Sequence, residues 1–284
     1  MASDLIWKYM RIDHLPHIWC AGCGNGTLTR DVAVAIDSII NDPENPVDRN
    51  KIMIVSGIGC SSRAAGYLDF NSLHTTHGRA IAFATGIKLA QPDMKIIVIT
   101  GDGDCSAIGG NHLIHACRRN MDLTVVVYNN NIYGMTGGQF SPTTPVQDKA
   151  TTAVYGVISR PFDIAKLAEG AGASFTGRGD IYHVKETTET IRQGILHKGF
   201  SLIDCASVCP TYYGRKNKKG DAIDMITWQK EHGVPVAAWE KMTPEQREGK
   251  YAVGKLTENF YPEYTDEYQK IIDAAMKEKN NGKI

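Results

Sequence analysis

The sequence predicts an α/β fold organised around a doubly wound, mainly parallel sheet. Residues 96–99 and 123–128 are short apolar runs of the kind that form strands buried on both faces of such a sheet. Residues 106–119, between them, have the pattern of a helix, so strand, helix and strand follow in the order of a βαβ unit. Two more apolar runs, residues 52–55 and 202–206, predict further parallel strands.

The remaining elements of the first 223 residues follow from apolar periodicity and from turn residues. Thr27 is expected to cap a helix that runs to Ile40 and whose apolar side chains share one face. Small residues favour a closely packed helix over residues 79–90. We also expect an N-terminal arm at 1–19, a long polar loop at 129–150, helices at 163–169 and 186–198, and a short strand at 173–176.

The chain changes character near residue 224. From there it becomes polar and loses the alternation of strand and helix, so residues 202–206 are expected to form the last core strand. We therefore divide the chain into one large domain, residues 1–223, and a C-terminal extension, residues 224–284, that contacts a partner subunit. One surface helix is expected within the extension, over residues 265–279.

Composition and charge argue against several classes of function. The 284-residue chain carries 31 basic and 31 acidic residues, so it has no net charge with which to attract nucleic acid. Its apolar runs are all too short for a membrane span, and its first eleven residues lack the pattern of a secretion signal. Seven cysteines without such a signal indicate reduced thiols or metal ligands, and hence a cytoplasmic location.

Polar side chains follow two of the predicted strands at their carboxyl ends. Gly101-Asp102-Gly103-Asp104 comes after the first of them, and Asn129-Asn130-Asn131 comes after the second. The carboxyl ends of parallel strands face one crevice, glycines let the backbone approach a phosphate, and carboxylate and amide oxygens suit Mg²⁺. An ordinary strand–turn–helix would explain a lone Gly-Asp-Gly, but not the asparagines 28 residues after Asp102 (130 minus 102). The pattern therefore predicts a diphosphate and magnesium site.

Four of the seven cysteines lie in predicted loops. Cys20 and Cys23 share a Cys-x-x-Cys turn, which zinc sites and thioredoxin-like redox centres also use. A zinc site needs a second Cys or His pair at short spacing, and the redox motif needs a preceding strand; the sequence offers neither. Cys60 and Cys209 each follow a predicted strand, and an iron–sulfur cluster can take its ligands from such distant loops.

These motifs together resemble a known family. Gly-Asp-Gly, followed after a helix and a strand by Asn-Asn, is similar to the thiamine diphosphate signature. The continuation, Tyr-Gly-Met-Thr-Gly-Gly-Gln at 133–139 and Ser-Pro-Thr-Thr at 141–144, resembles the beta subunit of the 2-oxoacid:ferredoxin oxidoreductases, and most of all the 2-oxoglutarate branch. The resemblance spans residues 17–217 and implies a thiamine diphosphate-binding fold of the diphosphate-domain type.

The resemblance implies a reversible reaction, in which 2-oxoglutarate, coenzyme A and oxidised ferredoxin give succinyl-CoA, CO₂ and reduced ferredoxin. The same chemistry on pyruvate or another 2-oxoacid is the nearest alternative. A non-oxidative thiamine diphosphate decarboxylase or synthase would have no use for the four cysteines. A non-catalytic electron-transfer or zinc-stabilised module would have no use for the predicted diphosphate site.

A glutamate that activates the thiamine ring is missing from every loop that we can place beside the cofactor. In the family this half of the site belongs to the alpha subunit. We therefore expect a heterodimer with that subunit, paired again into a dimer of heterodimers, and no activity from this chain alone.

The resemblance also implies roles for individual residues. The ligands of a [4Fe-4S] cluster would be Cys20, Cys23, Cys60 and Cys209, with Cys205, inside a predicted strand, as the competitor for the fourth place. Magnesium would be held by Asp102, Asn130 and the backbone carbonyl of Ile132. The thiamine cofactor would be bound by Ile58, Gly59, Cys60, Ser61, His74, Thr75, Thr76, His77, Gly101, Gly103, Asp104, Gly134 and Met135.

Two basic features of the sequence, Arg63 and residues 215–219, each allow more than one role. Arg63, three residues past Cys60, is the candidate for binding the distal carboxylate of 2-oxoglutarate and joins His77 as a candidate catalytic residue. A surface or subunit salt bridge is the alternative for Arg63. The basic run over residues 215–219 is typical of a solvated surface, and an acidic ferredoxin or the phosphates of coenzyme A are its other candidate partners.

Overall fold

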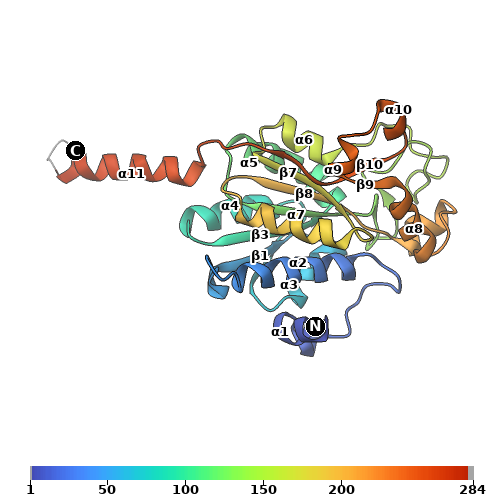
Figure 1. The fold of residues 1–284 in the computed structure, drawn as a ribbon, viewed down its shortest axis with the longest axis horizontal. Coiled ribbons are helices and arrows are strands. Elements are labelled where there is room, and N and C mark those ends of the chain that lie inside the picture. Colours follow the sequence, from blue (N-terminus) through green and yellow to red (C-terminus); the bar gives the residue numbers. More distant parts are fainter. Residues whose placement is uncertain (1, 281–284) are drawn as a thin grey trace.

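An eight-stranded sheet forms the centre of the protein in the computed structural model, which describes residues 2–280 (Figure 1). The strand order is β2-β1-β3-β4-β8-β7-β10-β9, and every pair of neighbours is parallel except β7 and β10. The doubly wound, mainly parallel sheet is thereby confirmed. Its strands are β1 (Ile52–Ser56), β2 (Asn71–His74), β3 (Lys95–Gly101), β4 (Thr124–Asn129), β7 (Phe175–Asp180), β8 (Ser201–Ala206), β9 (Gly233–Pro235) and β10 (Tyr251–Glu258).

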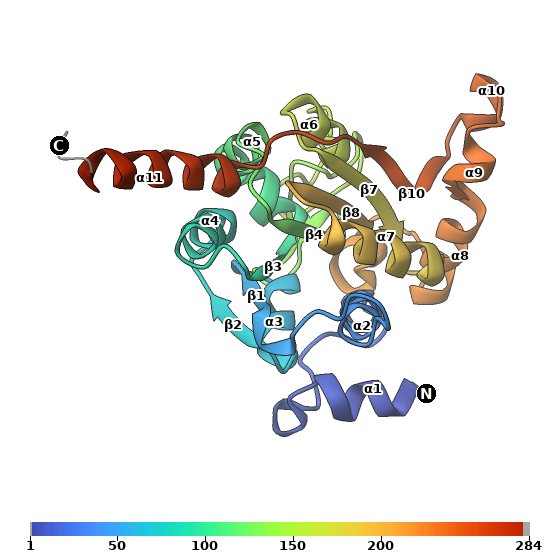
Figure 2. The ribbon, with the colours of Figure 1, turned by 60° about the vertical axis from the view of Figure 1, so that its left-hand side comes forward.

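Helices cover both faces of the sheet, which explains why its central strands are apolar on both sides. Figure 2 shows α2 and α7 on one face and α4, α5 and α6 on the other. Two separate apolar cores result, one containing Ile97 and Ile99 and the other Ile96 and Val98, because successive side chains of β3 point to opposite faces. The helices are α1 (Ala2–Tyr9), α2 (Asn25–Ile40), α3 (Ala64–Tyr67), α4 (Ala80–Ala90), α5 (Gly110–Arg118), α6 (Ile164–Gly170), α7 (Val184–Leu196), α8 (Ala222–His232), α9 (Val236–Trp239), α10 (Pro244–Arg247) and α11 (Tyr264–Asn280).

The strand order reverses direction between β1 and β3. From β1 the chain passes to β2 on one side, and β3 then returns to pair with the other side of β1. In doubly wound sheets, ligands bind in the crevice at the carboxyl ends of the strands beside such a reversal. The fold therefore places a binding crevice where Gly101-Asp102-Gly103 and the loop after β1 emerge.

Two helix boundaries differ from the sequence prediction. Thr27 does not cap α2, because the helix begins at Asn25 with Gly24 in the capping position. The helix predicted over residues 106–119 is divided into a π-helical turn, Asp104–Ile108, and α5. The π-helical turn begins directly after Gly103, so the irregularity lies at the crevice, where π-turns often accompany function.

The prediction that residues 202–206 form the last core strand is wrong. β10 joins the same sheet antiparallel to β7, and β9 pairs with β10 in turn. β10 was difficult to predict because only two of its eight side chains, those of Ala252 and Val253, are buried. The predicted surface helix is confirmed as α11, which projects from the body of the molecule (Figure 1) and buries only Thr265. None of the helices within residues 2–280 combines the length and apolar character that a membrane crossing requires.

Candidate active site

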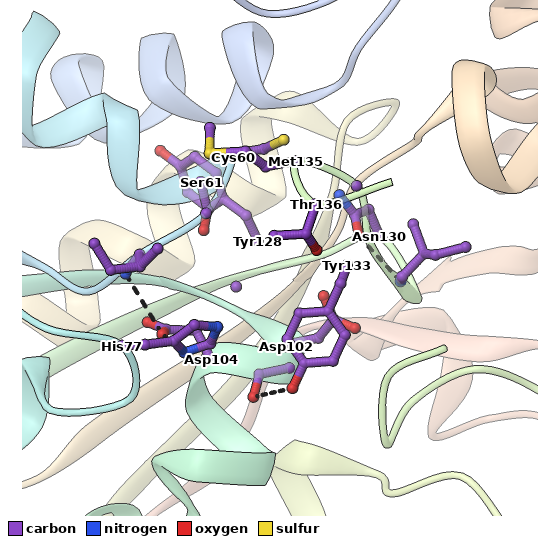
Figure 3. A pocket seen from close by; sticks show the side chains of 16 residues that line it. Cys60, Ser61, His77, Asp102, Asp104, Tyr128, Asn130, Tyr133, Met135 and Thr136 are labelled. Carbon is purple, nitrogen blue, oxygen red and sulfur yellow. Dashed lines mark hydrogen bonds and ion pairs between the residues drawn. The ribbon is translucent and has the colours of Figure 1, made fainter. Parts of the chain in front are cut away.

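A cavity opens at the carboxyl ends of β1, β3 and β4 (Figure 3). Three loops meet there, over residues 58–61, 101–104 and 130–136, because their parent strands are neighbours in the sheet. The cavity is lined by Ile58, Gly59, Cys60, Ser61, His77, Gly101, Asp102, Gly103, Asp104, Tyr128, Asn130, Ile132, Tyr133, Gly134, Met135 and Thr136. Three of these, Tyr128, Tyr133 and Thr136, were not singled out from the sequence.

Asp102 lies at the floor of this crevice and is 2 % exposed. Its Oδ2 accepts hydrogen bonds from Ser141 Oγ (2.5 Å) and Thr143 Oγ1 (2.6 Å). Burial raises the pKa of the carboxyl to about 6, since a buried carboxylate without a counter-charge is poorly solvated. A divalent cation beside the side chain would supply the missing positive charge, and Asn130 lines the same cavity.

Both carboxylate oxygens of Asp104 are occupied by contacts with neighbouring residues. Its Oδ1 accepts a hydrogen bond from the Gly78 N–H (2.7 Å) and lies 2.6 Å from Nδ1 of His77. Its Oδ2 accepts a hydrogen bond from Thr100 Oγ1 (2.9 Å). The two side chains lie against each other at the edge of the cavity in Figure 3, so Asp104 holds the His77 ring in one orientation.

Glycine is required at position 103 by the close approach of an aromatic ring. Tyr133 donates a hydrogen bond from its hydroxyl to the Gly103 carbonyl (3.0 Å). A Cβ atom at Gly103 would lie 2.2 Å from a carbon of the Tyr133 ring, which no side chain tolerates. Tyr133 therefore closes one wall of the crevice over the backbone of Gly103.

Four cysteines surround a second cavity that adjoins the first. Cys20, Cys23, Cys60 and Cys209 all line it, and Cys60, Asn130, Gly134 and Met135 line both cavities. A Cβ atom at Gly134 would lie 3.6 Å from the sulfur of Cys60 and 3.7 Å from that of Cys209, so any larger side chain would enter the space between the thiols.

The loops that carry these cysteines are joined to one another by hydrogen bonds. The Trp19 indole donates to the Cys60 carbonyl (2.7 Å), and the Gly24 N–H donates to the Val208 carbonyl (3.1 Å). Burial raises the pKa of Cys23 to about 12 and that of Cys60 to about 11, so both thiols keep their protons until a metal displaces them. Within residues 2–280, no three His, Cys, Asp or Glu side chains are placed to hold a single metal ion. The donor set and the space between the donors fit a polynuclear cluster.

The other cysteines lie apart from this cavity. Cys205 is wholly buried within β8, in the apolar core beneath α2 and α7. Cys105 and Cys117 are buried in the core on the opposite face of the sheet. The structure therefore groups Cys209, and not Cys205, with Cys20, Cys23 and Cys60.

Some predicted site residues do not line either cavity. His74 ends β2 and is exposed, Thr76 is exposed, and the Thr75 hydroxyl donates to the Ser56 carbonyl (2.9 Å). Arg63 ends a short 3₁₀ turn that begins just after Cys60. Its Nε is buried and finds no hydrogen-bond partner among the described residues.

Comparisons with known proteins agree with this geometry. Residues 57–205, which contain the crevice strands and loops, match the family described as thiamine pyrophosphate enzyme, C-terminal TPP binding domain. This match confirms the thiamine diphosphate-binding fold.

Curated relatives and a solved structure identify the branch of this family to which the chain is similar. The chain is 51% identical to the 2-oxoglutarate synthase subunit KorB of Methanocaldococcus jannaschii, over 95% of this chain and 98% of that one. It is 53% identical to the subunit of the same name from Archaeoglobus fulgidus, over 72% and 74%. The structure of a 2-oxoglutarate:ferredoxin oxidoreductase from Magnetococcus marinus, with 2-oxoglutarate, coenzyme A and succinyl-CoA bound, matches with a TM-score of 0.82 at 31% identity, over 95% of this chain and 90% of that one. The chain belongs to the family of 2-oxoglutarate synthase KorB subunits, the beta subunits of the 2-oxoglutarate:ferredoxin oxidoreductases.

Proposed function

We propose that this chain, as the beta subunit of a 2-oxoglutarate:ferredoxin oxidoreductase, binds thiamine diphosphate, Mg²⁺ and a [4Fe-4S] cluster in its two adjoining cavities. In the net reaction, 2-oxoglutarate and coenzyme A give succinyl-CoA and CO₂, and two electrons pass to oxidised ferredoxin. The observation that carries the proposal is the shared wall, in which Cys60 and Gly134 line both cavities. Electrons released in the first cavity need to cross only that wall. A non-oxidative decarboxylase or synthase would have no use for the second cavity.

We assign the metal and the cofactor to the cavity lining. Asp102, Asn130 and the Ile132 carbonyl would hold Mg²⁺, whose charge would offset that of the diphosphate. Ser141 and Thr143 fix the Asp102 carboxylate for that role through their two hydrogen bonds. Around the cofactor we place Ile58, Gly59, Ser61, His77, Gly101, Gly103, Asp104, Gly134 and Met135.

When bound, thiamine diphosphate supplies an electron sink for decarboxylation, and a [4Fe-4S] cluster supplies a one-electron acceptor. The residues of this chain position these groups and manage protons. Asp104 orients the His77 ring at the cavity, and we assign His77 to proton exchange there. Cys20, Cys23, Cys60 and Cys209 would bind the cluster as thiolates, each losing the proton that burial now favours for Cys23 and Cys60.

In the described part of the chain, the first cavity lacks an uncommitted carboxylate to activate the thiamine ring. Asp102 and Asp104 are the carboxylates that line it among the described residues, and both are committed to other contacts. The acidic group that activates the thiamine ring must therefore come from the alpha subunit, in a heterodimer that we expect to pair again. We assign part of residues 224–284 to contacts in that assembly. The seven free cysteines favour a cytoplasmic location, where thiols stay reduced.

Arg63 tests the substrate assignment. The assembled wild-type enzyme should prefer 2-oxoglutarate to pyruvate, because the unpartnered guanidinium can bind the distal carboxylate, which pyruvate lacks. Arg63→Ala should raise KM for 2-oxoglutarate by about tenfold or more, the worth of a lost charged hydrogen bond, and should leave KM for pyruvate nearly unchanged. Arg63→Lys keeps the charge but not the bidentate geometry, so its KM for 2-oxoglutarate should lie between those of the wild type and Arg63→Ala. Equal increases for both substrates in steady-state assays would rule out this role for Arg63.

A further inference from the structure

A cluster of cations lies on the surface next to the four-cysteine cavity. This basic surface consists of Lys149, Arg215, Lys216, Lys218 and Lys219, all of them exposed. Its two segments are far apart in sequence and are joined by one side chain. Asn217 accepts a hydrogen bond from the Lys149 N–H (2.6 Å) and donates another to the Lys149 carbonyl (3.0 Å). The fold thus gathers basic residues that the sequence shows as one short run and one isolated lysine.

A continuous helical segment links the basic surface to one of the cysteines. The Cys209 carbonyl accepts hydrogen bonds from the N–H groups of Tyr213 (3.1 Å) and Gly214 (2.9 Å), and the Tyr213 carbonyl accepts one from Asn217 (3.1 Å). Pro210–Gly214 form a π-helical turn, and Arg215 and Lys216 follow it directly. The positive charge is therefore held close to the thiols by backbone hydrogen bonds.

Most of these cations have no counter-charge of their own. Lys219 lies 3.6 Å from Asp148, whose other oxygen is bonded to the Tyr213 hydroxyl. Among the described residues, the remaining four cations of the basic surface form no ion pair. Lys149 follows Asp148 directly in sequence, and the nearest acidic residues after Arg215, Lys216 and Lys218 are Asp221 and Asp224, at the start of α8. Five cations against three carboxylates leave a net charge of +2 (5 minus 3) on a small exposed area, whose potential attracts anions.

Apolar side chains are exposed at the rim of the same cavity. Ile18 is 60 % exposed and Met135 is 44 % exposed, and Tyr212 lies in the helical segment just before the basic surface. Cys20 is exposed among them. A small apolar area over a redox centre, with positive charge on one side, suits a partner protein that binds transiently. The apolar contacts would orient the bound partner, and the charges would raise its association rate.

We propose that a small acidic electron-carrier protein docks on the basic surface and covers the cavity rim at Cys20. This inference rests on the proposed function, since it assumes that electrons leave through the four-cysteine cavity. The phosphates of coenzyme A are the competing occupant. The apolar rim and the exposed cysteine favour the protein, because neither feature would serve a phosphate.

The test is charge reversal in the assembled enzyme. Lys216→Glu combined with Lys218→Glu should lower kcat/KM for an acidic ferredoxin by about tenfold at low salt and weaken the salt dependence of that rate. Reduction of a viologen, a small acceptor that needs no protein docking, should stay at the wild-type rate with an unchanged KM for coenzyme A. The matched control reverses Lys277 and Lys279 on α11, at the far end of the molecule (Figure 1), and should change neither rate.

Each other outcome has a distinct meaning. An unchanged rate with ferredoxin would overturn the docking proposal. A raised KM for coenzyme A in the viologen assay would also overturn it, in favour of a phosphate site. Loss of viologen reduction would show that the charges act on the reaction itself and not on docking. If even the wild-type enzyme reduces no viologen with 2-oxoglutarate and coenzyme A, the proposed function fails, and the docking proposal fails with it.

Discussion

Cys209→Ala should yield enzyme without cluster iron, without the brown colour of an iron–sulfur protein, and without activity towards ferredoxin or viologen. Cys209 lines the four-cysteine cavity, so the substitution removes one of the four ligands that we propose for the cluster. Cys205→Ala is the matched control, four residues earlier in the chain. Its side chain is wholly buried in the apolar core, so its loss should cost about 1 kcal/mol of stability and leave the iron in place.

Iron content, visible absorption and the thermal unfolding midpoint of anaerobically purified protein distinguish these variants. Both variants should fold, because neither residue makes a strong side-chain bond in the iron-free protein: the Cys205 thiol contacts the Ile203 carbonyl only at 3.9 Å. Iron retained in Cys209→Ala but lost in Cys205→Ala would move the fourth ligand into β8 and contradict the site described above.

Asp102→Asn should abolish cofactor binding while leaving the fold intact. Removing the only charged ligand that we propose for Mg²⁺ should lower activity by about a thousandfold, the equivalent of roughly 4 kcal/mol. Thiamine diphosphate with Mg²⁺ should raise the unfolding midpoint of the wild-type enzyme, since a ligand stabilises the state that binds it, and should not raise that of the variant. Asp93→Asn, at an exposed carboxylate, is the control and should behave like the wild type.

The same substitution has an expected effect without cofactor. Burial raises the pKa of Asp102 to about 6 in the folded chain, from the ordinary aspartate value of 3.8. The folded state then holds a proton that the unfolded state has lost, so cofactor-free wild-type protein loses stability as pH rises from about 4 to 6. Asparagine cannot ionise, so cofactor-free Asp102→Asn should be the more stable protein at pH 8. Equal unfolding midpoints at pH 8 would show that the carboxylate is better solvated than its burial indicates.

The sequence was sufficient to predict the centre of the fold and most of the crevice. β3 and β4 are continuous apolar runs because both of their faces are covered, and such runs are recognisable without other information. Asp102 and Asn130 could be brought together because parallel strands end at one edge of a sheet. The four cysteines of the second cavity follow from the same rule, with the Cys-x-x-Cys turn packed against the strand ends.

The interactions that brace the site could not be predicted. Ser141 and Thr143 lie 39 and 41 residues from Asp102, in a loop without periodicity, so nothing in their spacing indicates that they bind its carboxylate. Asn217 joins Lys149 across 68 residues for the same reason. β10 was missed because a strand near the edge of a sheet needs few apolar residues and its sequence is mostly polar. Long-range polar contacts form only in the completed fold, so the local sequence pattern does not predict them.

The most direct test of the central claim is anaerobic viologen reduction by this chain, alone and co-purified with its alpha subunit, with coenzyme A and each of several 2-oxoacids. We expect no activity from the chain alone, and coenzyme A-dependent reduction with 2-oxoglutarate once the alpha subunit is present. Full activity from the isolated chain would contradict the shared active site. Assembled enzyme that reduces viologen with pyruvate or branched 2-oxoacids but not with 2-oxoglutarate would contradict the substrate, and enzyme that holds neither iron nor thiamine diphosphate would contradict the site itself.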